Sequence, residues 1–146
     1  MNKWEKVYHG TKFVSIEFIL KNGLEEFGEP LQNHIQLGQK INNINNWAAA
    51  IFVSPSIFYA SKYAELINYK NQEWFLIIEA RVRPSSFSIH ESTIYGYQFK
   101  KDEPKNVEYR IEDSINVVAT SLLFVNKDFL ENIRNFSESL VFKDDL

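Results

Sequence analysis

The sequence predicts one α+β domain in which split, mainly antiparallel β-sheets are flanked by short helices. Its 146 residues are close to the usual size of a single domain. Apolar residues make up 45% of the chain and aromatic residues 15%, enough to bury a core. Predicted strands occur in groups rather than alternating regularly with helices, which favours antiparallel pairing. We expect one domain over residues 1–146, with a core at about 6–136 and a loosely ordered C-terminal tail.

The first third of the chain predicts a strand, a short helix and a long loop. Lys6–His9 is expected to form a strand that ends in a Gly-Thr turn. Apolar residues then recur at helical spacing from Ser15 to Lys21, and Asn22-Gly23 predicts a left-handed helix end. Residues 25–47 combine Gly, Pro and several Asn without a sustained period. They predict a functional loop such as a lid, with a disordered insert as the alternative.

The remainder predicts most of the strands and two more helices. Ala48–Val53 is a short apolar run typical of a buried strand. Ser54-Pro55 predicts the N-cap and first-turn proline of a helix over residues 56–67. The other expected elements are strands at 74–84, 87–89 and 108–113, a polar loop at 95–107, a buried strand at 117–125, and a helix from Asn126 to about Phe136.

Composition excludes several classes of function. The chain has no cysteine, which rules out disulfides, thiolate chemistry and cysteine zinc sites. His9, His34 and His90 lack metal-ligand spacing, so no metal is expected. A net charge of −3 predicts no general attraction to nucleic acid or anionic membranes. The first residues lack the long apolar stretch of a signal peptide, and no run of eighteen apolar residues occurs, so we expect a soluble intracellular protein, cytoplasmic or nuclear.

The known phosphate-binding and hydrolase motifs are absent, and polar features at predicted strand ends remain. The chain has no GxGxxG, GxxxxGK[ST] or GxSxG sequence. The first feature is Tyr8-His9-Gly10-Thr11, where the histidine can bond a sugar hydroxyl and Gly10 lets a flat ligand approach the backbone. The alternative is a histidine with ordinary partners before a turn.

The second feature is an aromatic pair. Phe52 ends a predicted strand, and Tyr63 follows eleven residues later on the predicted helix. This spacing can return the Tyr63 ring to the end of the strand and form two facing walls for a flat ring. The alternative is packing of both rings in the core.

The third feature is Glu108, where a polar loop runs into a strand. A carboxylate at the edge of a pocket can accept a hydrogen bond from a sugar hydroxyl and stabilise a developing cation. The alternative is a solvated charge at a strand edge.

Taken together, the segments YHGTKFVSIEFILKNGL, AIFVSPSIFYASKYAE and VEYRIED resemble the His-Tyr-Glu class of ADP-ribosyltransferases. This class contains the catalytic domains of diphtheria toxin and the poly(ADP-ribose) polymerases. The resemblance runs from about Tyr8 to Val125 and includes the order of the motifs and the aromatic spacing. It implies the ADP-ribosyltransferase-like fold, and an enzyme of the glycosyltransferase type that moves ADP-ribose from the co-substrate NAD to a macromolecular acceptor, with release of nicotinamide.

The resemblance also implies roles for individual residues. Glu108 and His9 would be catalytic, with Glu108 stabilising the ribosyl cation and His9 bonding an NAD ribose. The implied NAD-binding residues are His9, Gly10, Thr11, Phe52, Ser61 and Tyr63. The loop at 25–47 would cover NAD, and the loop at 95–107, with Lys100 and Lys101, would present the acceptor. A protein acceptor is expected rather than nucleic acid.

Two departures from the family pattern leave other functions open. Phe52 stands where the family has a tyrosine, and Ala60, beside Ser61, stands at the position of a carboxamide-binding serine. One alternative is therefore a catalytically weak or inactive module that binds NAD, ADP-ribose or a protein. Another is an NAD glycohydrolase, in which water replaces the acceptor. An RNA 2′-phosphotransferase is disfavoured because no arginine lies beside His9 and the chain is acidic.

Overall fold

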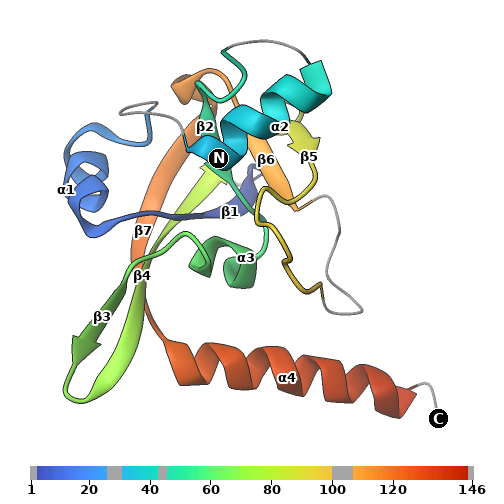
Figure 1. Ribbon diagram of the computed structural model, residues 1–146. Coiled ribbons are helices and arrows are strands. Elements are labelled where there is room, and N and C mark those ends of the chain that lie inside the picture. Colours follow the sequence, from blue (N-terminus) through green and yellow to red (C-terminus); the bar gives the residue numbers. More distant parts are fainter. Residues whose placement is uncertain (1–2, 26–30, 43–45, 100–106, 145–146) are drawn as a thin grey trace.

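The computed structural model describes residues 3–25, 31–42, 46–99 and 107–144. These form an α+β arrangement of two antiparallel sheets with short helices around them (Figure 1). The elements are β1 (Glu5–Gly10), α1 (Phe13–Asn22), α2 (Gln32–Asn42), β2 (Ile51–Val53), α3 (Ile57–Ser61), β3 (Leu66–Tyr69), β4 (Gln72–Val82), β5 (Ser88–His90), β6 (Glu108–Ile111), the 3₁₀ helix η1 (Ser114–Asn116), β7 (Val117–Asn126) and α4 (Lys127–Asp144).

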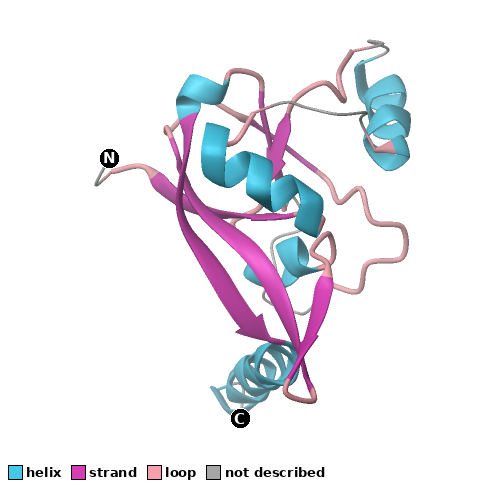
Figure 2. Cartoon of the chain, turned by 90° about the vertical axis from the view of Figure 1, so that its left-hand side faces the viewer, coloured by secondary structure: helices cyan, strands magenta, loops and turns pink. Residues whose placement is uncertain are grey.

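The larger sheet is built around the long strand β4. β7 pairs with one edge of β4 over almost its whole length. On the other edge, β3 pairs with the first residues of β4 and β1 with its last six, so these two strands follow one another along that edge. Figure 2 shows the long strands crossing the molecule, with α4 at one end and α2 near the other. None of the helices in the described part of the chain combines the length and apolar character needed to cross a bilayer.

The main core lies between this sheet and α1. Alternate residues of β4 point to one face, as the two-residue period of a strand requires. On α1, Ile16 and Ile19 are buried three residues apart, which places them on one side of the helix. The buried core cluster comprises Val7, Ile16, Ile19, Leu24, Ile51, Val53, Leu76, Ile78, Ala80, Val82, Ile111 and Val117.

A smaller sheet, in the order β2-β6-β5, joins the larger one through a single bridge. The backbone N–H of Tyr8 donates to the carbonyl of Ser54 at 2.7 Å, and the N–H of Ser54 donates back at 2.9 Å. The Ser54 hydroxyl donates to the carbonyl of Val107 at 2.7 Å. The ends of β1 and β2 and the start of β6 therefore meet at this junction.

The segment 25–47, expected to be a loop without secondary structure, contains the helix α2, so that expectation was wrong for residues 32–42. Residues 26–30 and 43–45 lie outside the described part of the chain. On α2, His34, Leu37 and Gly38 are buried while Gln36 and Gln39 are exposed. The buried positions are three and four residues apart, as in a helix. Two of them are His34 and Gly38, so the spacing of apolar residues does not indicate a helix here.

The predicted helix at 56–67 is also corrected. Ser56, not Ser54, caps α3, because its hydroxyl accepts from the N–H of Tyr59 at 3.2 Å. The helix ends at Ser61, and Leu66–Tyr69 forms the strand β3 instead. A turn in which Lys70 and Asn71 both have positive φ joins β3 to β4. Pairing with β4 thus outweighs the helical pattern of the local sequence.

The other expected elements occur with different limits or surroundings. The apolar run at 48–53 gives only the three-residue strand β2, and the expected strand at 87–89 lies at Ser88–His90. β7 is not buried as expected, because it lies at the sheet edge and Phe124 is 63% exposed. Asn126 accepts a hydrogen bond from the N–H of Phe129 at the start of α4, which runs to Asp144 rather than ending near residue 136.

Candidate functional site

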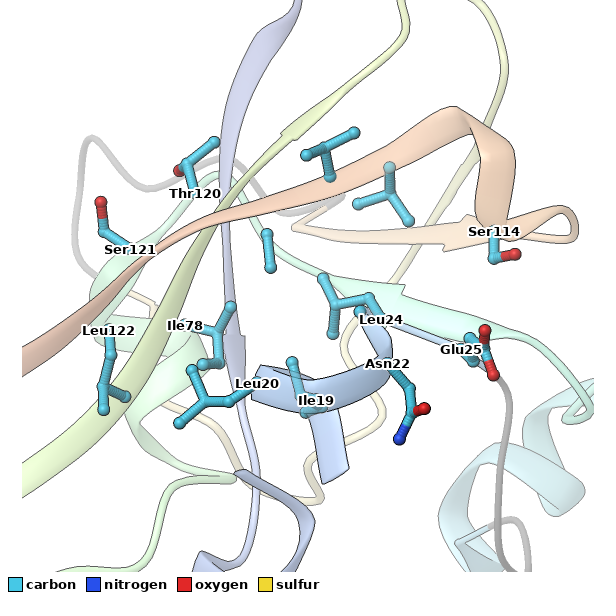
Figure 3. Close-up of a pocket in the computed structure, with 14 residues that line it drawn as sticks. Ile19, Leu20, Asn22, Leu24, Glu25, Ile78, Ser114, Thr120, Ser121 and Leu122 are labelled. Carbon is cyan, nitrogen blue, oxygen red and sulfur yellow. The ribbon is translucent and has the colours of Figure 1, made fainter. Parts of the chain in front are cut away.

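Two cavities differ in the kind of residue that lines them. One, of about 500 Å³, lies between the end of α1 and strand β7 (Figure 3). Its wall is formed mainly by aliphatic and hydroxyl side chains, including Ile19, Leu20, Thr120, Ser121 and Leu122. It contains none of the predicted site residues, and Glu25 is its one titratable side chain. The predicted site residues that line a cavity are therefore found in the second one.

The second cavity, of about 470 Å³, lies at the junction of the two sheets. It collects side chains from β1, β2, β6, the turn after α3, and α2. The predicted site residues that line it are His9, Gly10, Thr11, Phe52, Tyr63 and Glu108. Residues separated by almost a hundred positions in the sequence thus face one space.

The end of β1 fixes the orientation of His9. Its Nδ1 lies 2.8 Å from the Phe52 carbonyl, so the imidazole donates there and Nε2 is left as an acceptor when the ring is neutral. Burial lowers the pKa of His9, against the opposing effects of the Phe52 carbonyl and the Glu108 carboxylate. Gly10 is required here because a Cβ would lie 1.9 Å from the carbonyl oxygen of Ala60. This close approach brings α3 against the end of β1.

Glu108 is the most enclosed acid of the site, with only 2% of its surface exposed. The hydroxyls of Tyr59 and Thr93 donate to its Oε2 at 2.6 and 3.1 Å. Burial and the nearby carboxylate raise the pKa of Tyr59 above its ordinary value and that of Tyr63 to about 12. Both phenols are therefore neutral at pH 7. The Tyr63 hydroxyl bonds Thr93 rather than Glu108.

The other oxygen of Glu108 faces two histidines. His34 Nε2 lies 2.5 Å from Oε1, and His90 Nε2 lies 3.6 Å from the same oxygen. His90 also donates from Nδ1 to the Glu91 carbonyl at 2.8 Å, and burial lowers its pKa. Its Nε2 is buried and has no hydrogen-bond partner in the described structure. One carboxylate oxygen is thus held by hydroxyls and the other by imidazole.

The His34 ring also contacts both predicted aromatic walls. Its centroid lies 3.9 Å from that of Phe52 and 5.9 Å from that of Tyr63, with interplanar angles of 38° and 34°. Trp47 packs at 5.4 Å from Phe52 and at 4.9 Å from His90. A flat ring thus lies against both walls and bonds the acid.

Some predicted site residues lie elsewhere. Ser61 is buried and donates to the Phe58 carbonyl at 2.6 Å within α3, so its hydroxyl does not line the cavity. Lys100 and Lys101 lie outside the described residues, as does most of the predicted acceptor loop. Among the described residues, no group of three His, Cys, Asp or Glu side chains could hold a metal ion.

Sequence reasoning missed His34, Tyr59, His90 and Thr93. Tyr59 had a detectable signal, because it lies four residues before Tyr63 in a helical pattern, a spacing that brings side chains together. The other three approach Glu108 only through tertiary structure, and no local motif marks them.

Comparison of the sequence with protein-family models and with curated proteins finds no match. The chemistry of the site must therefore be read from its own residues. A buried carboxylate, a neutral histidine with one acceptor nitrogen, and two aromatic faces can together bind a sugar next to a planar heterocycle.

Proposed function

We propose that this chain is an NAD-dependent ADP-ribosyltransferase that transfers ADP-ribose to a protein acceptor and releases nicotinamide. The observation that carries the proposal is the single cavity that His9, Phe52, Tyr63 and Glu108 line together. These side chains come from separate elements and were expected to meet because of the family resemblance. The two antiparallel sheets and their order are compatible with an ADP-ribosyltransferase fold, which we also propose.

The hydrogen bonds that hold Glu108 in place suit this chemistry. When neutral nicotinamide leaves NAD, the ribosyl carbon gains positive charge, and a fixed carboxylate beside it stabilises the transition state more than the ground state. Tyr59 and Thr93 hold Oε2 by hydrogen bonds, so the acid is oriented before the substrate arrives. His9, kept neutral by burial, offers Nε2 as an acceptor for a ribose hydroxyl.

The rest of the cavity suits a dinucleotide. Its volume of about 470 Å³ lies within the usual range of small-molecule sites. Lys12 and Lys62 are exposed and line the same cavity, so its rim offers positive charge for a diphosphate. Phe52 and Tyr63 line the same cavity and offer ring faces to a flat ligand.

The described start of the predicted acceptor loop supports a macromolecular acceptor. Tyr95 is fully exposed, at 102% of its reference surface. The Tyr97 ring packs edge-on against Tyr59, with centroids 5.2 Å apart, and Tyr59 in turn holds Glu108. An acceptor bound along residues 95–99 would therefore lie close to the carboxylate.

Replacement of Glu108 by glutamine tests the proposal. The wild-type protein should release nicotinamide from NAD and become labelled, or label added protein, with ADP-ribose. Glu108→Gln should slow both by about two to three powers of ten, because it removes the charge that stabilises the cation. Glu112→Gln is the matched control, since the Glu112 side chain is 78% exposed and bonds Arg110 outside the cavity. Equal rates for wild type and Glu108→Gln would contradict the proposal.

A second candidate is a binding module that does not catalyse transfer. It is favoured by Phe52, which has a ring face but no hydroxyl at the wall where the resembled family has tyrosine. Such a module would bind NAD with measurable affinity and release no nicotinamide above a protein-free control. Release that is independent of any acceptor would instead identify an NAD glycohydrolase.

A further inference from the structure

The site already contains a ring where a substrate ring would bind. We define the ring slot as the space bounded by Phe52, Tyr63 and Oε1 of Glu108. The imidazole of His34 contacts all three, at centroid distances of 3.9 and 5.9 Å and at an Nε2–Oε1 distance of 2.5 Å. His34 is only 4% exposed, so it is fully inserted.

We propose that α2 is an autoinhibitory lid, and that NAD binds only after His34 withdraws from the ring slot. The inference rests on the proposed function, because it concerns access of NAD to the same site. An imidazole and a nicotinamide ring are both flat and aromatic, so they compete for the two aromatic faces. His34 also occupies the carboxylate oxygen that a ribose hydroxyl would use.

The carboxylate remains ordered after the lid leaves. Tyr59 lies on α3 and Thr93 follows β5, so the bonds to Oε2 at 2.6 and 3.1 Å do not depend on α2. With His34 the carboxylate loses its bond at Oε1, and the Thr93 hydroxyl loses its longer contact of 3.5 Å with His34 Nε2. A sugar hydroxyl can replace the imidazole N–H as the donor to that oxygen, so the exchange leaves no buried acceptor unsatisfied.

The helix that holds His34 is weak enough to move. α2 has eleven residues, and an isolated helix shorter than roughly 12 to 15 residues is marginal in water. Its buried described side chains are His34 and Leu37, while Gln36, Gln39 and Lys40 are exposed. Lys40 reaches Glu91 at 3.8 Å, but such exposed ion pairs contribute little. Helices with few buried contacts are the parts of a protein that open at low cost.

Gly38 shows how α2 is seated. A Cβ at this position would lie 2.7 Å from the Cβ of Trp47 and 3.2 Å from its Cγ. The Cβ of Trp47 does not move when the side chain changes rotamer, so such a change cannot relieve the shortest contact. The Gly38→Ala substitution would therefore displace the helix, although alanine is a better helix former than glycine. The substitution therefore disturbs the packing of α2 against Trp47 without weakening the helix itself.

The test measures NAD binding by the full chain with calorimetry, and nicotinamide release in parallel. If the closed form holds 90 to 99% of the molecules, removing it raises the apparent affinity by about ten- to a hundredfold. His34→Ala and Gly38→Ala should both show this gain, whereas Gln39→Ala, on the exposed side of α2, should bind as the wild type does. Gly38→Ala retains every side chain of the site and decides the question if His34→Ala fails to fold.

Free imidazole provides a readout that general loosening of the structure would not produce. In His34→Ala it should refill the ring slot and weaken NAD binding, while in the wild type, whose slot is filled, it should have no effect. If His34→Ala and Gly38→Ala both fold and bind NAD with the affinity of the wild type, the proposal that α2 is a lid is wrong.

The outcomes for lid and transferase are distinct. Tighter NAD binding by both variants, without nicotinamide release, would support the lid and reject the transferase. Nicotinamide release by the wild type at the same rate as by both variants would support the transferase and reject the lid. Failure of every form to bind NAD would reject both.

Discussion

The hydroxyl of Tyr59 should be the principal protein group that holds the Glu108 carboxylate. It donates to Oε2 at 2.6 Å and accepts from the N–H of Thr93 at 3.0 Å. Tyr59 is 1% exposed and Glu108 2% exposed, so water cannot replace either bond without rearrangement. Tyr59→Phe removes only the oxygen and leaves the ring packing in place.

The expected cost follows from these two bonds. A hydrogen bond to a charged group contributes about 1.5 to 3 kcal/mol, and a buried donor left unsatisfied costs about 1 to 3 kcal/mol. We expect Tyr59→Phe to lower the free energy of unfolding by about 3 kcal/mol. Tyr63→Phe is the matched control, because its hydroxyl bonds the neutral Thr93 hydroxyl in a half-buried position and should cost about 1 kcal/mol.

Urea denaturation of Tyr59→Phe, Glu108→Gln and the double variant measures the coupling between the two groups directly. Because neighbours that share a hydrogen bond are not additive, the double variant should lose less stability than the sum of the single variants, by about 1 to 3 kcal/mol. Additive losses, within about 0.5 kcal/mol, would show that Tyr59 does not hold the charge of Glu108.

Two further predictions concern pH and charge. Burial lowers the pKa values of His9 and His90, so the unfolded chain takes up protons first as the pH falls below about 6.5. The free energy of unfolding should therefore decrease from pH 7.5 to 5.5, less steeply in His90→Gln; an equal slope in both proteins would contradict this. Replacing Lys12 and Lys62 together by alanine should weaken NAD binding by about tenfold at low salt and by less at high salt, because the screening length shortens. Lys70→Ala, in the β3–β4 turn, should bind as the wild type does, and a salt-independent loss in the double variant would refute the role of the rim.

The parts of the fold that the sequence predicted are those with a strong local signal. β1 and β4 were predicted as strands, and α1 was predicted from its helical spacing of apolar residues. The positive φ of Gly23 agrees with the expected helix end. The hairpin between β3 and β4 was missed because Lys70-Asn71 is not a typical turn pair and the residues before it are compatible with a helix. Pairing with β4 decides between the two structures, and that partner is invisible in a local window.

The site was predictable to the extent that its residues lie at strand ends. His9, Phe52 and Glu108 lie at or near the ends of β1, β2 and β6, and these strands meet at the junction of the two sheets. The histidines at residues 34 and 90 could not be assigned to it, because an isolated imidazole carries no spacing information. Only the tertiary arrangement turns them into neighbours of one acid.

The bridge between Tyr8 and Ser54 has a consequence for how the proposed site would come apart on heating. Tyr8 precedes His9, and Ser54 bonds the residue before Glu108, so this bridge, together with the bond between His9 Nδ1 and the Phe52 carbonyl, sets the relative placement of the imidazole and the acid. The sheet that contains Glu108 has strands of only three and four residues, whereas β4 and β7 pair over almost their full lengths. Separation of the two sheets would disassemble the pocket while the larger sheet remains folded, so loss of the proposed site would precede the main thermal transition.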